Sequence, residues 1–310
     1  MRVVKIPKKS GGHRTIYVPD PAEMGRLRAM LPRLNELQER ADTVDCQHGF
    51  RRGRSPLTNA LPHRGFRFTL CFDLADFFDS VTRKGLCIEN DNDLASGIIQ
   101  TPFAFEVMDI CFQDGCARQG LPTSPLIANI AASGMDRDIV ALKSGRAGRF
   151  DRDFVYTRYA DDLTFSFDSP STAVWLKAEV PAIVEKHGFR INVRKTRLQS
   201  AAVGRRVVTG YAVDDQVHPT REVKRRLRAA KHSGRPSHAA GLEEFCRLKL
   251  PKNYTVPVAP QAAQGAAPLS NSPQRAKTRE NPVSSAAAPA PGARQDGGSD
   301  RKRAFDFGTT

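Results

Sequence analysis

The stretch that decides the fold runs from Arg158 to Phe167 and reads RYADDLTFSF. From Leu163 to Phe167 apolar and polar side chains alternate, which is typical of a β-strand with one buried face. Two adjacent aspartates, Asp161 and Asp162, stand at the mouth of this strand. Adjacent like charges usually lie in solvent-facing turns, so their place at the start of a half-buried strand requires a physical reason.

A third aspartate ends another predicted strand earlier in the chain. Alternating apolar residues mark this strand, and they are Phe66, Phe68, Leu70 and Phe72. Asp73 follows directly. Three carboxylates that meet in a partly buried place repel one another, at about 4 kcal/mol for two charges about 4 Å apart and an effective dielectric of about 20. Divalent cations relieve this repulsion, and Mg²⁺ prefers such hard oxygen ligands. The pattern therefore predicts that the three aspartates converge on a metal site.

The overall composition favours a nucleic-acid partner. The chain has 310 residues, of which 40% are hydrophobic, enough for one large or two moderate domains. A formal net charge of +15 suits a protein that binds a polyanion, and a solvated basic surface is the alternative. The six cysteines have neither the spacing nor the nearby histidines of a zinc site. No apolar run is long enough for a signal peptide or a membrane span, so we expect a cytoplasmic protein with no membrane partner.

Further elements are expected on either side of these strands. Two β-like pieces, Val3–Ile6 and Thr15–Val18, flank PKKSGGHR (7–14), which predicts a hairpin with a cationic tip. Apolar residues at helical spacing predict a helix from Ala22 to about Arg40. From about Val256 the chain is rich in Ala, Pro, Ser, Gly and Gln, which predicts a disordered tail.

The order of these parts resembles the palm motifs of reverse transcriptases. The motifs are FDLADFF (72–78), RQGLPTSPLIANI (118–130), RYADDLTFS (158–166), HGFRINVRKT (187–196) and VVTGYAVDD (207–215). More narrowly, QGLPTSPLIAN, RYADDLTFS and VTGYAV, with HGFRRGRSPLTNA (48–60), are similar to retron-type bacterial reverse transcriptases, relatives of the group II intron enzymes. The resemblance covers about residues 3 to 255.

The resemblance implies an α+β right-hand polymerase fold. Such a fold has fingers, a palm with an antiparallel sheet flanked by helices, and a helical thumb; here a disordered C-terminal tail would follow. We expect fingers and palm over residues 1–204, the thumb over 205–255 and the tail over 256–310. We also expect that an N-terminal helical segment of many relatives is absent and that the thumb is short. We expect no RNase H, endonuclease or maturase domain, which argues against a complete group II intron protein.

The resemblance also implies catalytic roles. Asp73, Asp161 and Asp162 match the catalytic, metal-binding aspartates of the family, with the backbone carbonyl of Leu74 as an extra ligand. Two Mg²⁺ ions, with Mn²⁺ as an alternative, would lower the pKa of a primer hydroxyl and stabilise the pyrophosphate leaving group. The alternative is that these are surface acids in turns.

Other positions match the nucleotide-binding residues of the family. Phe78 matches the steric gate, whose ring would clash with a ribose 2′-hydroxyl, and Phe77 beside it must face the other way; core packing is the alternative for Phe78. Gly120 would allow close backbone approach to the nucleotide. Gln119 would hydrogen-bond near the sugar or base, with a purely structural role in the loop as the alternative.

Cationic residues complete the expected nucleotide site. Lys8 and Arg14 in the hairpin match the side chains that grip the triphosphate, and Lys9 is an alternative to Lys8. Lys195 matches a lysine near the active site that either protonates or neutralises pyrophosphate.

The segment TREVKRRLRAAKHSGR (220–235) predicts a thumb helix that contacts nucleic acid. Val223 and Leu227 form a thin apolar stripe, and the rest of the helix is densely basic. A solvated helix is the alternative. The residues expected to bind the primer–template backbone are Arg221, Lys224, Arg225, Arg226 and Arg228.

These expectations together predict a reverse transcriptase, an RNA-dependent DNA polymerase. By analogy with retrons it would copy a structured noncoding RNA, which serves as template and primer, into DNA from deoxynucleoside triphosphates. The product would be an RNA–DNA hybrid, with a role in phage defence and an effector protein of unspecified identity. Two alternatives stay open: a defence-associated polymerase with untemplated or protein-primed DNA synthesis, and a non-catalytic RNA-binding protein.

Overall fold

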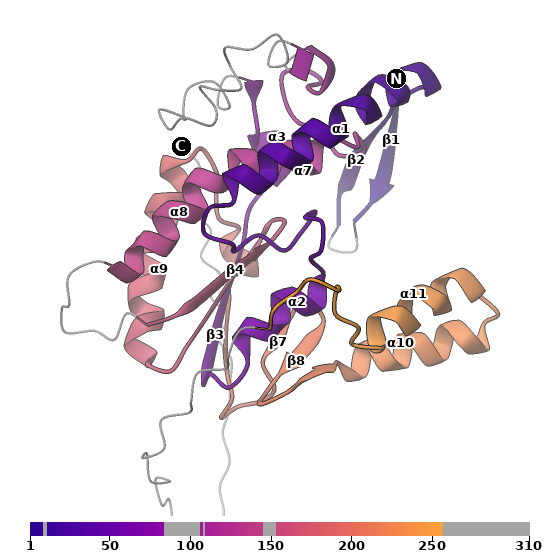
Figure 1. Ribbon diagram of the computed structural model, residues 1–310. Helices are drawn as coiled ribbons and strands as arrows, with labels where there is room; N and C mark the ends of the chain where they lie inside the picture. Colours follow the sequence, from indigo (N-terminus) through magenta and orange to yellow (C-terminus); the bar gives the residue numbers. More distant parts are fainter. Residues whose placement is uncertain (9–10, 84–105, 108, 145–152, 257–310) are drawn as a thin grey trace, which may run out of the picture. The chain divides into compact units, whose positions relative to one another are not determined.

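The computed structural model describes residues 1–8, 11–83, 106–107, 109–144 and 153–256 (Figure 1). All of them belong to one compact unit, Met1–Gln264. The predicted tail therefore lies outside the described residues, except for Val256. No helix in the described ranges is long and apolar enough to cross a bilayer.

A four-stranded antiparallel sheet carries the aspartates. Its order is β4 (Val155–Tyr159), β5 (Asp162–Phe167), β3 (Phe68–Asp73) and β6 (Arg197–Ser200). The sequence predicts one buried face for β5, but every residue after Asp162 in this strand is buried. The polar residues are buried too because elements cover both faces: the Ser166 hydroxyl meets the Nδ1 atom of buried His63 at 2.9 Å.

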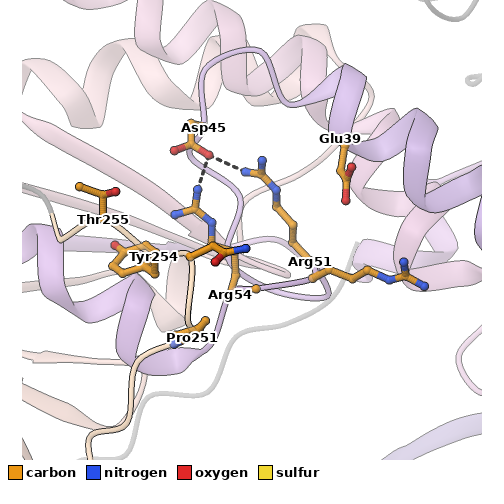
Figure 2. A pocket seen from close by; sticks show the side chains of 10 residues that line it. Glu39, Asp45, Arg51, Arg54, Pro251, Tyr254 and Thr255 are labelled. Carbon is orange, nitrogen blue, oxygen red and sulfur yellow. Dashed lines mark hydrogen bonds and ion pairs between the residues drawn. The ribbon is translucent and has the colours of Figure 1, made fainter.

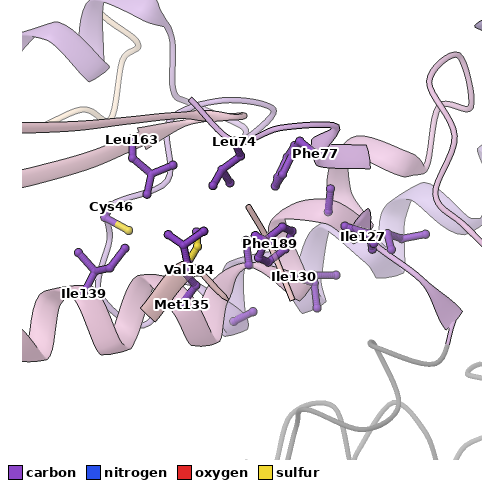
Figure 3. Close-up of a cluster of buried hydrophobic side chains, with 14 of the residues drawn as sticks. Cys46, Leu74, Phe77, Ile127, Ile130, Met135, Ile139, Leu163, Val184 and Phe189 are labelled. Atoms are coloured by element: carbon purple, nitrogen blue, oxygen red, sulfur yellow. The ribbon is translucent and has the colours of Figure 1, made fainter. Parts of the chain in front are cut away.

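Helices supply most of the apolar core against this sheet. They are α1 (Pro21–Ala41), α7 (Ser124–Ala131), α8 (Ser133–Ala141) and α9 (Pro170–Lys186). Figure 3 shows Leu163 of β5 together with Met135 and Ile139 of α8 and Val184 of α9. The predicted helix over residues 22–40 is confirmed by α1, whose start is fixed by a capping box between Asp20 and Glu23.

A second, smaller apolar cluster joins the sheet to the segment that follows it. It contains residues of α2 (Pro56–Ala60), η1 (Leu61–His63) and a small sheet of β7 (Val207–Val208), β8 (Tyr211–Val213) and β9 (Val217–Pro219). Buried Arg206 donates from Nη1 to the His63 carbonyl at 2.9 Å and to Thr69 Oγ1 at 3.0 Å. Residues on both sides of position 204 therefore share a core, and the division into fingers, palm and thumb stays a prediction.

Within the described ranges, the remaining named elements are two hairpins and three short helices. β1 (Arg2–Pro7) and β2 (His13–Val18) pair antiparallel, which confirms the predicted hairpin. α10 (Arg221–His232) and α11 (Pro236–Cys246) form a helical hairpin, joined by the ion pair of Lys231 with Glu243. The short helices are α3 (Phe77–Ser80), η2 (Leu142–Ser144) and η3 (Val193–Lys195).

Candidate active site

The central sheet brings the three predicted aspartates to one of its ends. Asp73 and Asp162 lie directly opposite each other in the β3–β5 register. Asp161 stands in the two-residue turn between β4 and β5, because Tyr159 pairs with Asp162. The Leu74 amide donates to the Asp161 carbonyl at 2.8 Å, which ties the end of β3 to this turn.

The aspartates repel one another electrostatically. Burial raises the pKa of Asp161, and the charge of Asp73 raises it further. Burial, Asp161 and Asp73 together raise the pKa of Asp162 to about 6, although part of this side chain reaches solvent. Lys195 offsets some of this charge, because its Nζ donates to the two Asp73 carboxylate oxygens at 2.7 and 3.1 Å. The uncompensated negative charge favours a bound cation.

The donor chemistry of the aspartates fits Mg²⁺. Carboxylate oxygens are its preferred ligands, and their mutual repulsion would be relieved by a divalent ion. Across the described residues, however, no three His, Cys, Asp or Glu side chains gather closely enough to hold an ion as a group. Asp73 is instead paired with Lys195. An entering ion would therefore compete with the Lys195 ammonium for this carboxylate.

A cavity of about 340 Å³ opens beside this strand end. It is lined by Cys71, Phe72, Asp73, Asp162, Arg194, Lys195 and Arg197. The two carboxylates and three cations of this lining suit a ligand that carries phosphates together with a metal ion. The cavity is therefore the candidate nucleotide site.

A larger cavity, of about 500 Å³, lies between the loop around Arg51–Arg54 and the segment 251–255 (Figure 2). Of its three arginines, Arg51 and Arg54 already pair with Asp45. Arg54 also lies over the Tyr254 ring, 5.0 Å from its centre. None of the three aspartates lines this cavity. Size alone therefore does not identify the site. The smaller cavity is the better candidate because predicted metal-binding aspartates, Asp73 and Asp162, line it together with cations.

The two phenylalanines after β3 differ in burial, but their ring centres lie only 5.5 Å apart, and Phe78 packs against the same core cluster that contains Phe77. Phe77 is buried, with its ring centre 5.7 Å from that of Phe189. Phe78 is half-buried and lies against Phe50, with ring centres 6.1 Å apart. Phe78 is therefore the one that keeps part of its ring exposed at the end of β3.

Gln119 and Gly120 contact the β1–β2 hairpin. The Tyr17 amide donates to the Gln119 carbonyl at 2.8 Å. Gly120 has a φ of +105°, and a Cβ there would lie 2.1 Å from the Tyr17 carbonyl oxygen. We expected Gly120 to allow close approach of a nucleotide, whereas the close approach seen is to the backbone of β2. The Gln119 side-chain oxygen is buried and has no hydrogen-bond partner among the described residues.

The hairpin also carries the two predicted triphosphate cations. Lys8 begins its tip, where its amide donates to the Gly12 carbonyl at 3.0 Å. Arg14 is exposed, and its charge reaches the aspartate site, where it counters the rise in the pKa of Asp161. The alternative Lys9 lies outside the described residues.

The predicted thumb cations all lie on α10. Val223 and Ala230 are buried on this helix, while Arg221, Lys224, Arg225, Arg226 and Arg228 are exposed. No described carboxylate forms an ion pair with any of these five side chains. Their charges are therefore available to an anionic partner.

One supporting element was not anticipated from the sequence. Residues 46–48 run beside β4, with the His48 amide donating to the Arg158 carbonyl and the Arg158 amide to the Cys46 carbonyl, both at 2.8 Å. A Cβ on the next residue, Gly49, would lie 2.4 Å from the Ala160 nitrogen. The glycine of the HGF sequence at 48–50 was the available signal, because close packing against the aspartate turn leaves no room for a side chain there.

A pH effect follows from the raised pKa of Asp162. The folded chain holds the Asp162 proton up to about pH 6, whereas the unfolded chain releases it near pH 3.8. Without metal, this group therefore favours folding below pH 3.8, and the contribution is lost as the pH rises to about 6. We expect the stability of wild type relative to Asp162→Asn to fall across this window, measured by thermal unfolding at several pH values. A pH-independent difference would contradict the assignment.

Comparison with known proteins identifies the family. Residues 6–226 match the family described as reverse transcriptase (RNA-dependent DNA polymerase). The chain is 36% identical over 259 residues to the Retron Mx162 reverse transcriptase of Myxococcus xanthus, covering 74% of this chain and 51% of the relative. It is 36% identical over 270 residues to the Retron Mx65 reverse transcriptase of the same organism, covering 80% of this chain and 61% of the relative.

A third relative is covered more fully. The chain is 33% identical over 238 residues to the Retron Ec86 reverse transcriptase of Escherichia coli, covering 74% of this chain and 69% of that protein. The predicted family and the α+β polymerase fold are thereby confirmed. The chain spans about half of the first relative and three fifths of the second. It belongs to the reverse transcriptase family and, within that family, to the retron type.

Proposed function

We propose that this protein is an RNA-dependent DNA polymerase that copies a structured noncoding RNA into DNA. The observation that carries the proposal is that β3 and the β4–β5 turn bring Asp73, Asp161 and Asp162 to the same end of the sheet, in a chain of the reverse transcriptase family. The cations of the adjoining cavity suit a deoxynucleoside triphosphate. The exposed basic face of α10 suits the RNA–DNA hybrid.

The aspartates are the proposed ligands of two Mg²⁺ ions, with Mn²⁺ as an alternative and the Leu74 carbonyl as a further ligand. When bound, such ions activate the primer hydroxyl and stabilise charge on the pyrophosphate leaving group. Lys195, whose Nζ lies 2.7 Å from Asp73 Oδ1, would place a positive charge beside the phosphates. Arg14, together with Lys8, would hold the triphosphate from the hairpin side.

Phe78 is the proposed gate against ribonucleotides. Removing its ring with Phe78→Ala should raise the use of ribonucleotides relative to deoxynucleotides about 10- to 200-fold, because the 2′-hydroxyl then has room. Single-nucleotide incorporation of ATP and dATP measures the ratio. Phe78→Tyr keeps the ring and should leave the ratio low. An unchanged ratio in Phe78→Ala would assign Phe78 to core packing.

The basic face of α10 is the proposed contact with the primer–template backbone. Arg225→Ala combined with Arg226→Ala should weaken binding and lower the magnitude of the slope of log K against log salt concentration by about 1 to 2. Fewer phosphate contacts mean that fewer counterions are released on binding. Filter binding at several salt concentrations measures the slope. The matched control, Lys177→Ala with Lys186→Ala, removes the same charge from exposed positions on α9. Equal slopes in the two double variants would refute the contact.

The polymerase activity itself is tested by primer extension. The full chain is incubated with a DNA-primed RNA, the four deoxynucleotides and Mg²⁺. The proposal expects a DNase-sensitive product complementary to the RNA. A product formed equally well without RNA would favour untemplated synthesis, and retention of RNA without any product would favour a non-catalytic RNA-binding role.

The nature of the RNA is proposed from the retron resemblance. Sequencing of the nucleic acid that copurifies with the chain should yield one defined RNA–DNA species. A heterogeneous mixture would argue against a dedicated noncoding RNA.

The proposed role in phage defence predicts fewer phage plaques on cells that carry the intact locus than on cells in which Asp161 is replaced by Asn.

A further inference from the structure

A buried polar network lies directly behind the turn that carries Asp161. Its centre is Arg158, whose side chain has no solvent exposure. The guanidinium forms a bidentate ion pair with Asp136 of α8, in which Nε donates to Oδ1 at 2.9 Å and Nη2 donates to Oδ2 at 2.7 Å. The remaining nitrogen, Nη1, donates to Asn129 Oδ1 at 2.8 Å and to the Ala160 carbonyl at 3.1 Å. One of its hydrogen bonds therefore ends on the backbone of the turn.

The residue that Arg158 holds is strained. Ala160 has a φ of +57°, in the left-handed region, which costs a residue with a side chain about 1–3 kcal/mol. Gly49 packs against the Ala160 nitrogen on another side of the turn. Asn129 links the two supports, because its Nδ2 donates to the Gly49 carbonyl at 2.8 Å while its Oδ1 accepts from Arg158. The same amide thus braces both groups that hold Ala160.

Asp136 is itself fixed in place. The Tyr156 hydroxyl donates to its Oδ1 at 2.7 Å, and Gln47 Nε2 donates to its Oδ2 at 3.1 Å. Both Tyr156 and Gln47 are buried. The carboxylate therefore presents one orientation to Arg158, and the guanidinium fork transmits that orientation to the turn.

Stability alone does not require this arrangement. A buried ion pair is often no more stabilising than apolar side chains of similar volume, because desolvation offsets the attraction. A planar fork with fixed geometry, in contrast, orients a neighbouring group better than an apolar side chain does. Arg158 contacts the turn at the Ala160 carbonyl, so it acts on the turn through the backbone.

We propose that Arg158, oriented by Asp136 and Asn129, is a positioning residue that fixes the backbone of Ala160 and so places the Asp161 carboxylate for metal binding. The inference rests on the proposed function, since the aspartates are its proposed metal ligands. It adds residues from β4, α7 and α8 to the support of the site. Replacing a residue that orients a metal ligand typically lowers metal affinity or activity by about 10- to 100-fold.

The test compares two matched replacements, Arg158→Lys and Arg206→Lys. Both arginines are buried. Each replacement removes the planar guanidinium, with its fixed hydrogen-bond geometry, and keeps the positive charge. Arg206 contacts the His63 and Val213 carbonyls, not the aspartate turn. Arg158→Lys should raise the Mg²⁺ concentration for half-maximal extension and weaken Mn²⁺ binding, followed by electron paramagnetic resonance, by about tenfold or more. Arg206→Lys should lower the melting temperature but leave both metal readouts unchanged.

A second variant separates positioning from folding. Asn129→Ser removes the brace on Arg158 and Gly49 while the Arg158–Asp136 pair stays, and it should shift the metal readouts in the same direction. Adding Ala160→Gly to Arg158→Lys should recover part of the metal affinity, because glycine adopts a positive φ without strain. Wild-type metal responses in both Arg158→Lys and Asn129→Ser would overturn the proposal.

The two proposals fail in distinguishable ways. If Mn²⁺ binding depends on Arg158 but wild type extends no primer, the positioning role stands and the polymerase proposal falls. If wild type extends primers and Arg158→Lys does so with an unchanged Mg²⁺ requirement, the positioning role falls and the polymerase proposal stands.

Discussion

Asp161→Asn is expected to reduce Mg²⁺-dependent primer extension by about a thousandfold or more while the chain stays folded. The amide keeps the size of the carboxylate but removes its charge, so the proposed metal site loses one of three anionic ligands. A loss of about 4 kcal/mol of transition-state stabilisation corresponds to this factor. Single-turnover extension of a primed RNA measures the rate, and thermal unfolding measures the fold.

The stability of this variant provides an independent check. Burial and Asp73 raise the pKa of Asp161, which means that its charged form is unfavourable in the metal-free fold. Asp161→Asn should therefore be at least as stable as wild type at pH 7 without metal. Added Mg²⁺ should stabilise wild type more than the variant, because a ligand that binds the folded chain raises its melting temperature.

A matched acid shows whether the effect is specific. Asp138 on α8 pairs with Lys186 and His187 at 2.8 and 2.9 Å and does not line the candidate nucleotide cavity. Asp138→Asn should leave extension near the wild-type rate. Comparable extension by Asp161→Asn and wild type would remove Asp161 from the catalytic site.

Gly120→Ala is expected to have the second-largest effect, through the β1–β2 hairpin. The new Cβ would stand 2.1 Å from the Tyr17 carbonyl oxygen, so backbone must move. The positive φ adds about 1–2 kcal/mol and the overpacking about 1–3 kcal/mol, a total destabilisation of about 2–5 kcal/mol. Displacement of the hairpin would carry Arg14 away from the aspartates and raise the KM for deoxynucleotides. Chemical denaturation and steady-state extension measure the two effects.

Gly115→Ala is the control for backbone strain. Gly115 has a φ of +76°, but a Cβ there would meet no heavy atom within 4 Å. The free energy of unfolding of this variant should fall by only about 1–2 kcal/mol, and its KM for deoxynucleotides should equal that of wild type. If Gly120→Ala behaved like Gly115→Ala, the contact between Gly120 and Tyr17 would have no functional weight.

The features that follow from local pattern were predictable from the sequence. Alternating apolar residues located β3 and β5, and the aspartates at their ends fell at one edge of the sheet because antiparallel partners align Asp73 with Asp162. Apolar residues at helical spacing predicted the helix over residues 22–40 that α1 confirms. These signals are contained in neighbouring residues, so no knowledge of the tertiary contacts was needed.

The support of the site was not predictable in this way. Arg158 lies within a strand whose pattern says nothing about its partner, and an arginine is ordinarily expected at the surface. It is buried only because Asp136, on a helix formed by a different motif, neutralises it. The contacts of Gly120 with Tyr17 and of Gly49 with Ala160 join segments distant in the chain. In the sequence, the only local sign of such a contact is the glycine itself.

The most direct test of the central claim is anomalous diffraction from crystals of the full chain with Mn²⁺, a primed RNA and a non-reactive deoxynucleotide analogue. The account predicts anomalous peaks bound by carboxylate oxygens of Asp73, Asp161 and Asp162, next to the phosphates of the analogue. Peaks elsewhere, or a bound analogue with Asp73 still paired to Lys195 and no ion beside it, would contradict the account.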